Sequence, residues 1–207
     1  MEIVLEDIGR RFNREWIFQK LNYRFSAGQS YAILGPNGSG KSTLLQVVAS
    51  SLTPSQGAIR YVLDGAPVTA DMAYNLMSIA APYMELIEEF TLAEHIAFHF
   101  SFKNYRSGYD IQTLIDLTGL QASRNKPIRQ FSSGMRQRVK LALACCSDTP
   151  VLLLDEPTSN LDRAGIDWYQ HLVNATRDNR LIIVCSNQEE EYRFCNETIL
   201  ITDYKTV

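Results

Sequence analysis

Short runs of consecutive apolar residues alternate along the chain with longer stretches in which apolar residues recur at helical spacing. Runs of the first kind are typical of buried strands, and stretches of the second kind are typical of amphipathic helices. The pattern predicts strands at residues 3–6, 21–25, 31–34, 59–63, 78–81, 151–154, 181–185 and 198–201. It predicts helices at residues 41–51, 92–102, 110–118, 134–147, 162–177 and 189–194.

The order of these elements indicates the fold class. Continuous apolar strands that alternate with helices are typical of a parallel sheet with both faces covered. Between residues 91 and 149 this alternation gives way to successive helices. We therefore predict one α/β domain over residues 1–207, with a core at about 1–82 and 150–207 and a helical subdomain at about 83–149.

Composition and charge exclude several classes of protein. The 207 residues are 45% hydrophobic and 21% charged, with a net charge of −3, and these are ordinary values for a globular protein. Because nucleic-acid binders usually carry a basic stripe, we expect no nucleic-acid partner. The longest apolar runs are far shorter than the roughly 20 residues of a membrane span, and the N-terminus lacks a signal-peptide pattern. We therefore expect a cytoplasmic protein.

A complete phosphate-binding motif lies between a predicted strand and a predicted helix. The pattern G-x-x-x-x-G-K-[ST] is matched by Gly35, Pro36, Asn37, Gly38, Ser39, Gly40, Lys41 and Ser42, and Thr43 follows. Backbone N–H groups of such a loop and the N-terminus of its helix bind phosphate oxygens. Lys41 adds a positive charge at the β- and γ-phosphates, and the Ser42 hydroxyl is a ligand for Mg²⁺. The motif therefore predicts a nucleotide site.

Two acidic residues end a second apolar strand. Asp155 and Glu156 follow the predicted strand at 151–154, at the carboxyl edge where α/β sheets bind ligands. We expect Asp155 to hold Mg²⁺ through water and Glu156 to act as the general base that polarises the attacking water. A solvated acid pair in a turn would give the same pattern, and the phosphate-binding motif favours the catalytic interpretation.

Residues 131–137, Phe-Ser-Ser-Gly-Met-Arg-Gln, complete a resemblance to a known family. They resemble the signature L-S-G-G-Q of the ATP-binding subunits of ABC transporters, and the resemblance covers essentially the whole chain. It implies a P-loop NTPase cassette with a mostly parallel core sheet, an antiparallel β part and an α-helical subdomain, which binds ATP and Mg²⁺. Two departures are Ser133, in place of a Gly, and Met135, in place of the Gln.

The signature implies a composite site. In the family, the residues that correspond to Ser132 and Gly134 contact the γ-phosphate of ATP held by the other subunit's P-loop. Two cassettes therefore close head-to-tail around two nucleotides. Taken alone, Ser132 could simply be the N-cap of the following helix.

Two further positions take their roles from the resemblance. Asp162, at the end of Ser159-Asn160-Leu161-Asp162, occupies the family's D-loop, which crosses the dimer interface. It is equally a candidate N-cap. Phe12 lies where the family places an aromatic residue that stacks on adenine. Trp16 is the alternative, and a buried core role is another interpretation of Phe12.

Two loops depart from the family pattern. Tyr83 stands where the family has a Gln that helps bind Mg²⁺ and water, and Asn187 stands where it has a switch His. The Asn187 amide can donate to a γ-phosphate, but it stays neutral where a His could become cationic. Losing one positioning group typically costs about 10²–10³ in rate. Because Glu156 is retained with Lys41, we expect an ATP hydrolase that is slow rather than inactive.

The resemblance also implies partners. They are a second cassette, from the same or a different chain, and an integral-membrane permease supplied by separate chains, which would hold the protein on the cytoplasmic face of the membrane. The apolar residues Met84, Leu86, Ile87 and Phe90 are a candidate permease contact, and they could equally be core. The Ser-Ser-Gly-Met variant and the short single cassette favour an exporter.

Two other functions are compatible with the same motifs. An ATP-gated, dimerising regulatory module with little or no hydrolysis is compatible with the replaced Gln and His. A cassette of the translation or DNA-repair type is less favoured, because such proteins usually carry two cassettes or a long coiled-coil insert, and the sequence shows neither.

Overall fold

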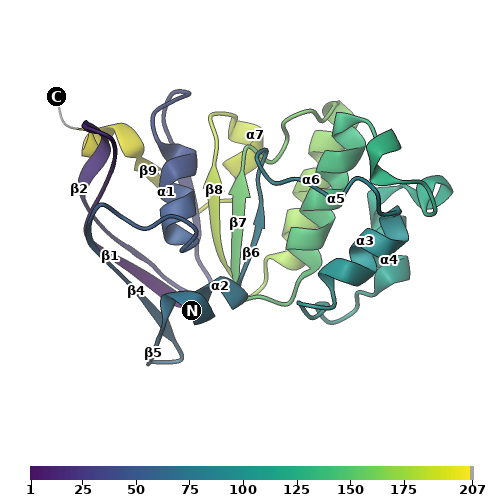
Figure 1. The fold of residues 1–207 in the computed structure, drawn as a ribbon, viewed down its shortest axis with the longest axis horizontal. Helices are drawn as coiled ribbons and strands as arrows, with labels where there is room; N and C mark the ends of the chain where they lie inside the picture. The colour runs from purple at the N-terminus through teal and green to yellow at the C-terminus, as the bar shows by residue number, and fades with distance from the viewer. Residues whose placement is uncertain (206–207) are drawn as a thin grey trace.

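The computed structural model describes residues 1–205, which form two β-sheets with helices between and beside them (Figure 1). The strands are β1 (Glu2–Phe12), β2 (Glu15–Phe25), β3 (Ser30–Leu34), β4 (Gln56–Leu63), β5 (Ala66–Val68), β6 (Met77–Ala80), β7 (Val151–Asp155), β8 (Leu181–Cys185) and β9 (Glu197–Leu200). The helices are α1 (Lys41–Val48), α2 (Ala70–Asn75), α3 (Leu92–His99), α4 (Ile111–Thr118), α5 (Ser133–Cys146), α6 (Arg163–Thr176) and α7 (Glu189–Tyr192). Short 3₁₀ turns lie at Gln121–Ser123, Ile128–Gln130 and Ile201–Tyr204.

The larger sheet is parallel and has the strand order β6-β7-β8-β3-β9. Every residue of β7 and β8 is buried, because these strands are covered on both faces. Their continuous apolar sequences are what such a position requires. The predicted α/β class with a mostly parallel core sheet is therefore confirmed.

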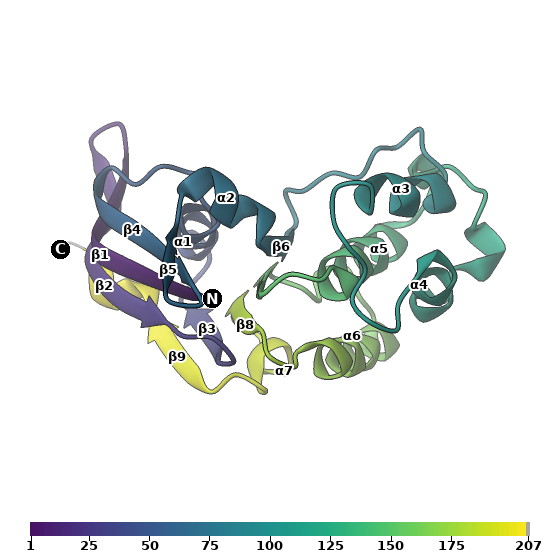
Figure 2. The same ribbon diagram turned by 90° about the horizontal axis from the view of Figure 1, so that it is seen from below.

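The smaller sheet is antiparallel and has the strand order β2-β1-β4-β5. It packs with α1 against one face of the parallel sheet, and α5 and α6 lie on the other face (Figures 1 and 2). Two apolar clusters correspond to this layering. One joins the antiparallel sheet, α1 and one face of the parallel sheet, and the other joins α3 to α6 and the opposite face.

The predictions were least accurate in the antiparallel sheet. The strand predicted at residues 3–6 extends over Glu2–Phe12, and its pairing with β2 shifts register at three places. These irregularities break the alternation of apolar and polar residues on which the prediction depends. The predictions also missed β5 and α2, which are too short to show a period.

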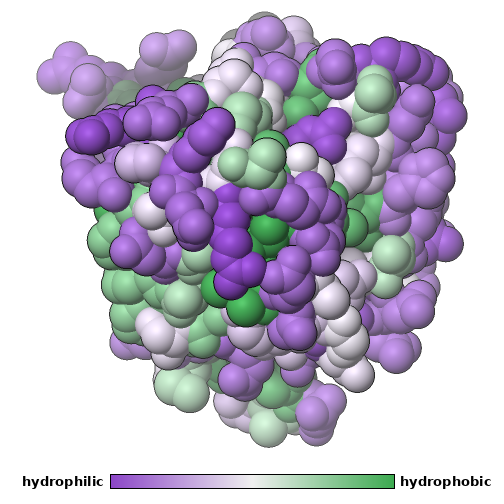
Figure 3. Space-filling view, turned by 90° about the vertical axis from the view of Figure 1, so that its right-hand side faces the viewer, coloured by the Kyte–Doolittle hydropathy of each residue, from purple (hydrophilic) through white to green (hydrophobic). Residues whose placement is uncertain are grey.

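Successive helices do occupy the segment between β6 and β7, as predicted. Figure 3 views the molecule from this end, the right-hand side of Figure 1, and hydrophilic residues cover most of the face. The exact limits of a helical subdomain, at about 83–149, stay a prediction. Within residues 1–205, no helix is both long and apolar enough to cross a membrane.

Candidate functional site

The phosphate-binding loop joins β3 to α1 at the carboxyl edge of the parallel sheet. Its last residue, Gly40, has a φ of 107° and precedes the first residue of α1, Lys41. A Cβ atom at Gly40 would overlap with the Cγ2 atom of Ile17 on β2. Both the left-handed backbone and the contact with Ile17 therefore require glycine here. The predicted motif stands in the predicted place, between a buried strand and a helix.

Lys41 lies within the curve of this loop. Its ammonium Nζ donates to the carbonyl oxygens of Gly35 at 2.6 Å and Pro36 at 3.3 Å, and the residue is only 5% exposed. The side chain is thus turned back over the loop, where phosphate oxygens would compete with these carbonyls for the ammonium. Pro36, Asn37 and Gly38 are exposed, whereas Ser39 is buried.

Asp155 ends β7 and is almost fully buried. Burial raises the pKa of its carboxyl group to about 6, the charge of Glu156 adds to this, and a hydrogen bond from Ser42 and the charge of Lys41 oppose it. The Oδ1 atom is buried and has no hydrogen-bond partner among the described residues. An unpartnered carboxylate oxygen beside a serine hydroxyl provides the hard oxygen ligands that Mg²⁺ prefers. Ser42 and Asp155 therefore fit a Mg²⁺ ion.

Glu156 sits in an unusual backbone conformation. Its backbone φ is 42°, a value that residues other than glycine rarely adopt. Its backbone N–H donates to the carbonyl oxygen of Cys185 at the end of β8, at 2.9 Å. This bond holds the residue at the carboxyl edge of the sheet, with its side chain half-buried. Strained conformations of this kind cluster at functional sites.

The two atypical residues lie near this centre. The amide Nδ2 of Asn187 donates to Oδ1 of Asn37 in the phosphate-binding loop, at 3.0 Å. Tyr83 is 45% exposed. The pKa of its phenol is raised to about 12, first by burial and then by the negative charge of Asp155, while a hydrogen bond with Gln46 opposes the shift. Asn187 therefore contacts the phosphate-binding loop, and Tyr83 lies near Asp155; their roles at the nucleotide stay predictions.

The signature residues begin α5. Ser132 is its N-cap, and its hydroxyl accepts a hydrogen bond from the backbone N–H of Met135 at 3.2 Å. Ser132 also remains exposed, so the capping role and contact with an external anion are compatible. A Cβ atom at Gly134 would lie 3.0 Å from the carbonyl oxygen of Asn160. The signature is thus packed directly against the loop that precedes α6.

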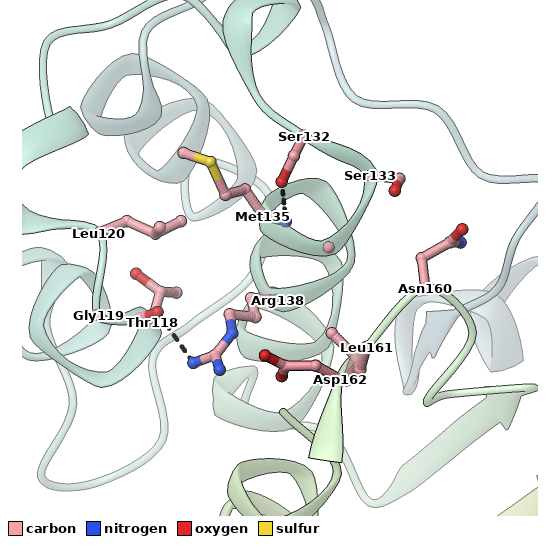
Figure 4. Close-up of a pocket in the computed structure, with 11 residues that line it drawn as sticks. Thr118, Gly119, Leu120, Ser132, Ser133, Met135, Arg138, Asn160, Leu161 and Asp162 are labelled. Atoms are coloured by element: carbon pink, nitrogen blue, oxygen red, sulfur yellow. Dashed lines mark hydrogen bonds between the residues drawn. The ribbon is translucent and has the colours of Figure 1, made fainter. Parts of the chain in front are cut away.

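A hollow of about 520 Å³ lies at this junction (Figure 4). Its lining comprises Thr118, Gly119, Leu120, Ser132, Ser133, Gly134, Met135, Arg138, Asn160, Leu161 and Asp162. Asp162 caps α6 by accepting from the N–H of Gly165 at 2.8 Å, so its N-cap interpretation is correct, and its side chain is exposed as well. Arg138 also lines the hollow, and its guanidinium lies over the Trp168 ring. The sequence gives no signal for this contact, because it joins distant segments.

The phosphate-binding loop and the signature occupy opposite sides of one sheet. α1 lies on the face covered by the antiparallel sheet, and α5 lies on the other face (Figures 1 and 2). Gln137 ties α5 to the acid pair, since its Nε2 donates to the carbonyl oxygen of Pro157 at 2.8 Å. This hydrogen bond and the contact of Gly134 with the carbonyl oxygen of Asn160 link the start of α5 to the segment that follows Glu156.

The two candidate aromatic residues of the β1–β2 hairpin contact different arginines, Phe12 contacting Arg10 and Trp16 contacting Arg11. Phe12 is 47% exposed, so it is not a core residue. It lies two residues from Arg10, which pairs with Phe18, and Phe18 packs beneath Gly40. Trp16 pairs instead with Arg11, beyond a register shift that lies between Arg10 and Arg11. Phe12 is the more exposed of the two residues, so it is the more accessible to a ligand.

The cluster Met84, Leu86, Ile87 and Phe90 is divided between surface and core. Met84 and Ile87 line a groove of about 420 Å³ between α2, β6 and α3. Leu86 packs against the second apolar cluster. Phe90 makes an edge contact with Phe98 of α3, with the ring centroids 5.4 Å apart. The groove also exposes the rings of Tyr74, Phe98 and Phe102.

Comparisons with known proteins identify the family. The family model for ABC transporters matches residues 18–159. A Nod factor export ATP-binding protein from Sinorhizobium fredii is 26% identical over 96% of this chain. A sulfate/thiosulfate import ATP-binding protein from Synechocystis is 29% identical over 99% of it. The chain spans only 60% and 59% of the lengths of these two relatives.

Solved structures share the fold. A protein described as the ATP-binding protein of an ABC transporter from Pyrococcus furiosus superposes with a TM-score of 0.82 at 18% identity, over the full length of both chains. A dimeric bacterial ABC transporter cassette superposes with a TM-score of 0.80 at 22% identity, over 96% of this chain and 93% of the other. Because the family model matches the segment from β2 to Ser159, well over half of the chain, the chain belongs to the ABC transporter family.

Proposed function

We propose that this chain binds and hydrolyses Mg²⁺-ATP at the interface of a head-to-tail dimer of cassettes, and that closure of the dimer drives a separate permease. The observation that carries this proposal is the placement of the phosphate-binding loop and the signature on opposite sides of one sheet. A triphosphate on one chain can meet a signature only on another chain. The second cassette is another copy or a related chain.

Each residue of the proposed site has a defined task. The backbone N–H groups of the loop, including Gly38, and the N-terminus of α1 bind the phosphates. Lys41 leaves the carbonyls of Gly35 and Pro36 and pairs with the β- and γ-phosphates. Ser42 would hold Mg²⁺ directly and Asp155 would hold it through water, and the ion would supply positive charge at the phosphate oxygens. Thr43, in the first turn of α1, adds a backbone N–H near the phosphates.

Glu156 is the proposed general base, and the partner chain completes the site. The carboxylate of Glu156 accepts a hydrogen bond from the attacking water and orients that water toward the γ-phosphorus. Ser132 and Gly134 of the second chain offer a hydroxyl and backbone N–H groups to the γ-phosphate oxygens, where charge develops during transfer. Asp162 lies in the same hollow as the signature and so belongs to the interface.

Slow turnover is the expected consequence of Tyr83 and Asn187. Asn187 already donates its amide to Asn37, so it must exchange that acceptor to reach a γ-phosphate. Tyr83 lies close enough to Asp155 for the carboxylate charge to raise the pKa of its phenol. The neutral phenol of Tyr83 can donate a hydrogen bond to a water near a bound metal. Losing one well-placed donor costs about 10²–10³ in rate. The proposal is therefore binding of ordinary strength with slowed hydrolysis.

The groove lined by Met84 and Ile87 is the proposed permease contact. Its volume of about 420 Å³ and its exposed aromatic rings favour an apolar segment as the occupant. The permease would hold the chain at the cytoplasmic face of a membrane. Export is the proposed direction, on the ground of the Ser-Ser-Gly-Met variant and the short single cassette. Relatives named for export and for import both match.

The alternative is a regulatory module that dimerises on ATP without turnover. The replaced Gln and His favour it, and the retained Glu156 opposes it. Steady-state Mg²⁺-ATP hydrolysis by the purified chain, at several protein concentrations and beside Glu156→Gln, separates the two. Turnover that rises steeply with concentration and is lost in Glu156→Gln supports the ATPase. ATP binding with turnover no greater than that of the variant supports the regulatory module.

A further inference from the structure

We infer that Arg10 is a positioning residue for nucleotide binding: it holds the Phe12 ring as a platform on which the adenine base stacks. This inference rests on the proposed function. The sequence offers no signal for it, because Arg10 becomes a neighbour of the ring only through the conformation of β1 and its contact with a distant loop.

The contacts of Arg10 fix it at both ends. Its guanidinium carbon lies 4.6 Å from the centroid of the Phe12 ring. Its Nη1 donates to the carbonyl oxygen of Thr53, in the turn after α1, at 3.0 Å. Arg10 is half-buried, and its Nε is buried without a hydrogen-bond partner among the described residues. The guanidinium is therefore held over the ring rather than free in solvent.

The Phe12 ring is covered by Arg10 and still open to a ligand. The residue remains 47% exposed with the guanidinium in place. An aromatic ring that carries a cation on one face can still stack a base on the other, and such stacking tolerates any base. Without such a contact, the ring at the hairpin tip would become ordered only on binding the base, and this loss of side-chain entropy would weaken binding. Arg10 reduces this cost by ordering the ring beforehand.

The location of the platform suits a bound triphosphate. Arg10 pairs across the hairpin with Phe18, which packs beneath Gly40 at the end of the phosphate-binding loop. Phe12 lies two residues from Arg10, whose guanidinium covers its ring. The platform and the loop are thus joined through one cross-strand pair.

The same hairpin provides a matched control. Arg11 is the next residue, is exposed, and its guanidinium carbon lies 5.5 Å from the centroid of the Trp16 ring. Replacing Arg11 removes the same charge and a similar cation–π contact from the neighbouring position of β1. Arg11→Ala therefore measures the effect of charge, and the difference between Arg10→Ala and Arg11→Ala isolates the platform.

The experiment measures the dissociation constants of ATP and of inorganic tripolyphosphate, by calorimetry, in the full chain carrying Glu156→Gln so that ATP is not consumed. Tripolyphosphate has no base and reports the phosphate site alone. We expect Phe12→Ala to weaken ATP binding about 5- to 100-fold. We expect Arg10→Ala to weaken it about 2- to 5-fold relative to Arg11→Ala, with tripolyphosphate binding equal in the two arginine variants.

Three results would overturn the inference, and each is distinct. If Arg10→Ala and Arg11→Ala bind ATP equally well and Phe12→Ala binds it more weakly, Arg10 has no positioning role, although the base still stacks on Phe12. A parallel loss of ATP and tripolyphosphate in Arg10→Ala assigns the effect to charge. If Phe12→Ala binds ATP as tightly as the unsubstituted ring does, the base does not stack on Phe12 and the inference is wrong. The proposed ATPase function is still supported in that case if Lys41→Ala abolishes ATP binding. If Arg10→Ala does not fold, Arg10→Gln retains a donor for Thr53, and we expect the same loss.

Discussion

At the scale of single residues, the buried carboxyl group of Asp155 opposes folding and favours metal binding. Its pKa is raised from 3.8 to about 6, so the fold favours the protonated form. That contribution to stability is complete below pH 3.8 and is lost as the pH rises through 6. At neutral pH the ionised group is therefore a destabilising element, which a bound Mg²⁺ would compensate.

Asp155→Asn tests this directly. At pH 7.5 without nucleotide, we expect the variant to be more stable than the wild type by about 1–3 kcal/mol, because no buried charge is formed. We expect the difference to shrink at pH 5. Mg²⁺-ATP should raise the unfolding midpoint of the wild type and have little effect on the variant. Urea titrations at both pH values provide the measurement, and a variant that is less stable at pH 7.5 would contradict the account.

The sequence predicts those site residues that belong to a short motif with fixed spacing. It does not predict residues whose site contacts join segments that are far apart in the sequence. The segment from Gly35 to Ser42 and the pair Asp155 and Glu156 have fixed spacings, and the structure places them together at one sheet edge. The hydrogen bond between Asn187 and Asn37 spans 150 positions. The hydrogen bond between Gln137 and Pro157 likewise depends on how α5 packs.

At the scale of elements, buried elements were predicted better than exposed ones. β7 and β8 are continuous apolar runs because both of their faces are covered. β1 and β2 contain polar residues and bulges, so their lengths could not be read from alternation. The observed helix ends also differ from the predicted ones. α1 ends at Val48 rather than at residue 51, because Ser50 has a φ of 60°, which is incompatible with a right-handed helix.

The packing of α3 on the end of α5 predicts sensitivity to acid. His99 of α3 bonds through Nε2 to the hydroxyl of Ser147, at 2.9 Å. Burial lowers its pKa to about 4, and the charges of His95 and Lys103 lower it further. The neutral ring is therefore what the fold accommodates. Its contribution to stability is complete above pH 6.5 and is lost as the pH falls from 6.5 toward 4.

His99→Gln keeps a side chain that can bond to Ser147 and removes the titration. We expect the wild type to lose about 2–3 kcal/mol more stability than the variant between pH 7 and pH 4. Chemical denaturation across this range measures the difference. His171→Gln, at an exposed position on α6, is the control and should follow the wild type. Parallel curves for the wild type and His99→Gln would refute the assignment.

At the scale of the whole molecule, the layered architecture makes one chain insufficient for the proposed reaction. The parallel sheet separates α1 from α5 (Figure 2), and with them the groups that hold the triphosphate from the groups that complete its site. In the proposed head-to-tail dimer, these halves meet twice. The layering is what such a composite site would require.

Mixing two inactive variants tests this central claim most directly. Lys41→Ala damages the phosphate-binding loop, and Gly134→Asp damages the signature, where any Cβ meets the carbonyl of Asn160. A mixed dimer contains one intact loop facing one intact signature. We predict negligible ATP hydrolysis by either variant alone and restored hydrolysis in an equimolar mixture, up to about a quarter of the wild-type rate for random pairing with independent sites. Wild-type hydrolysis without any restoration in the mixture would contradict the account.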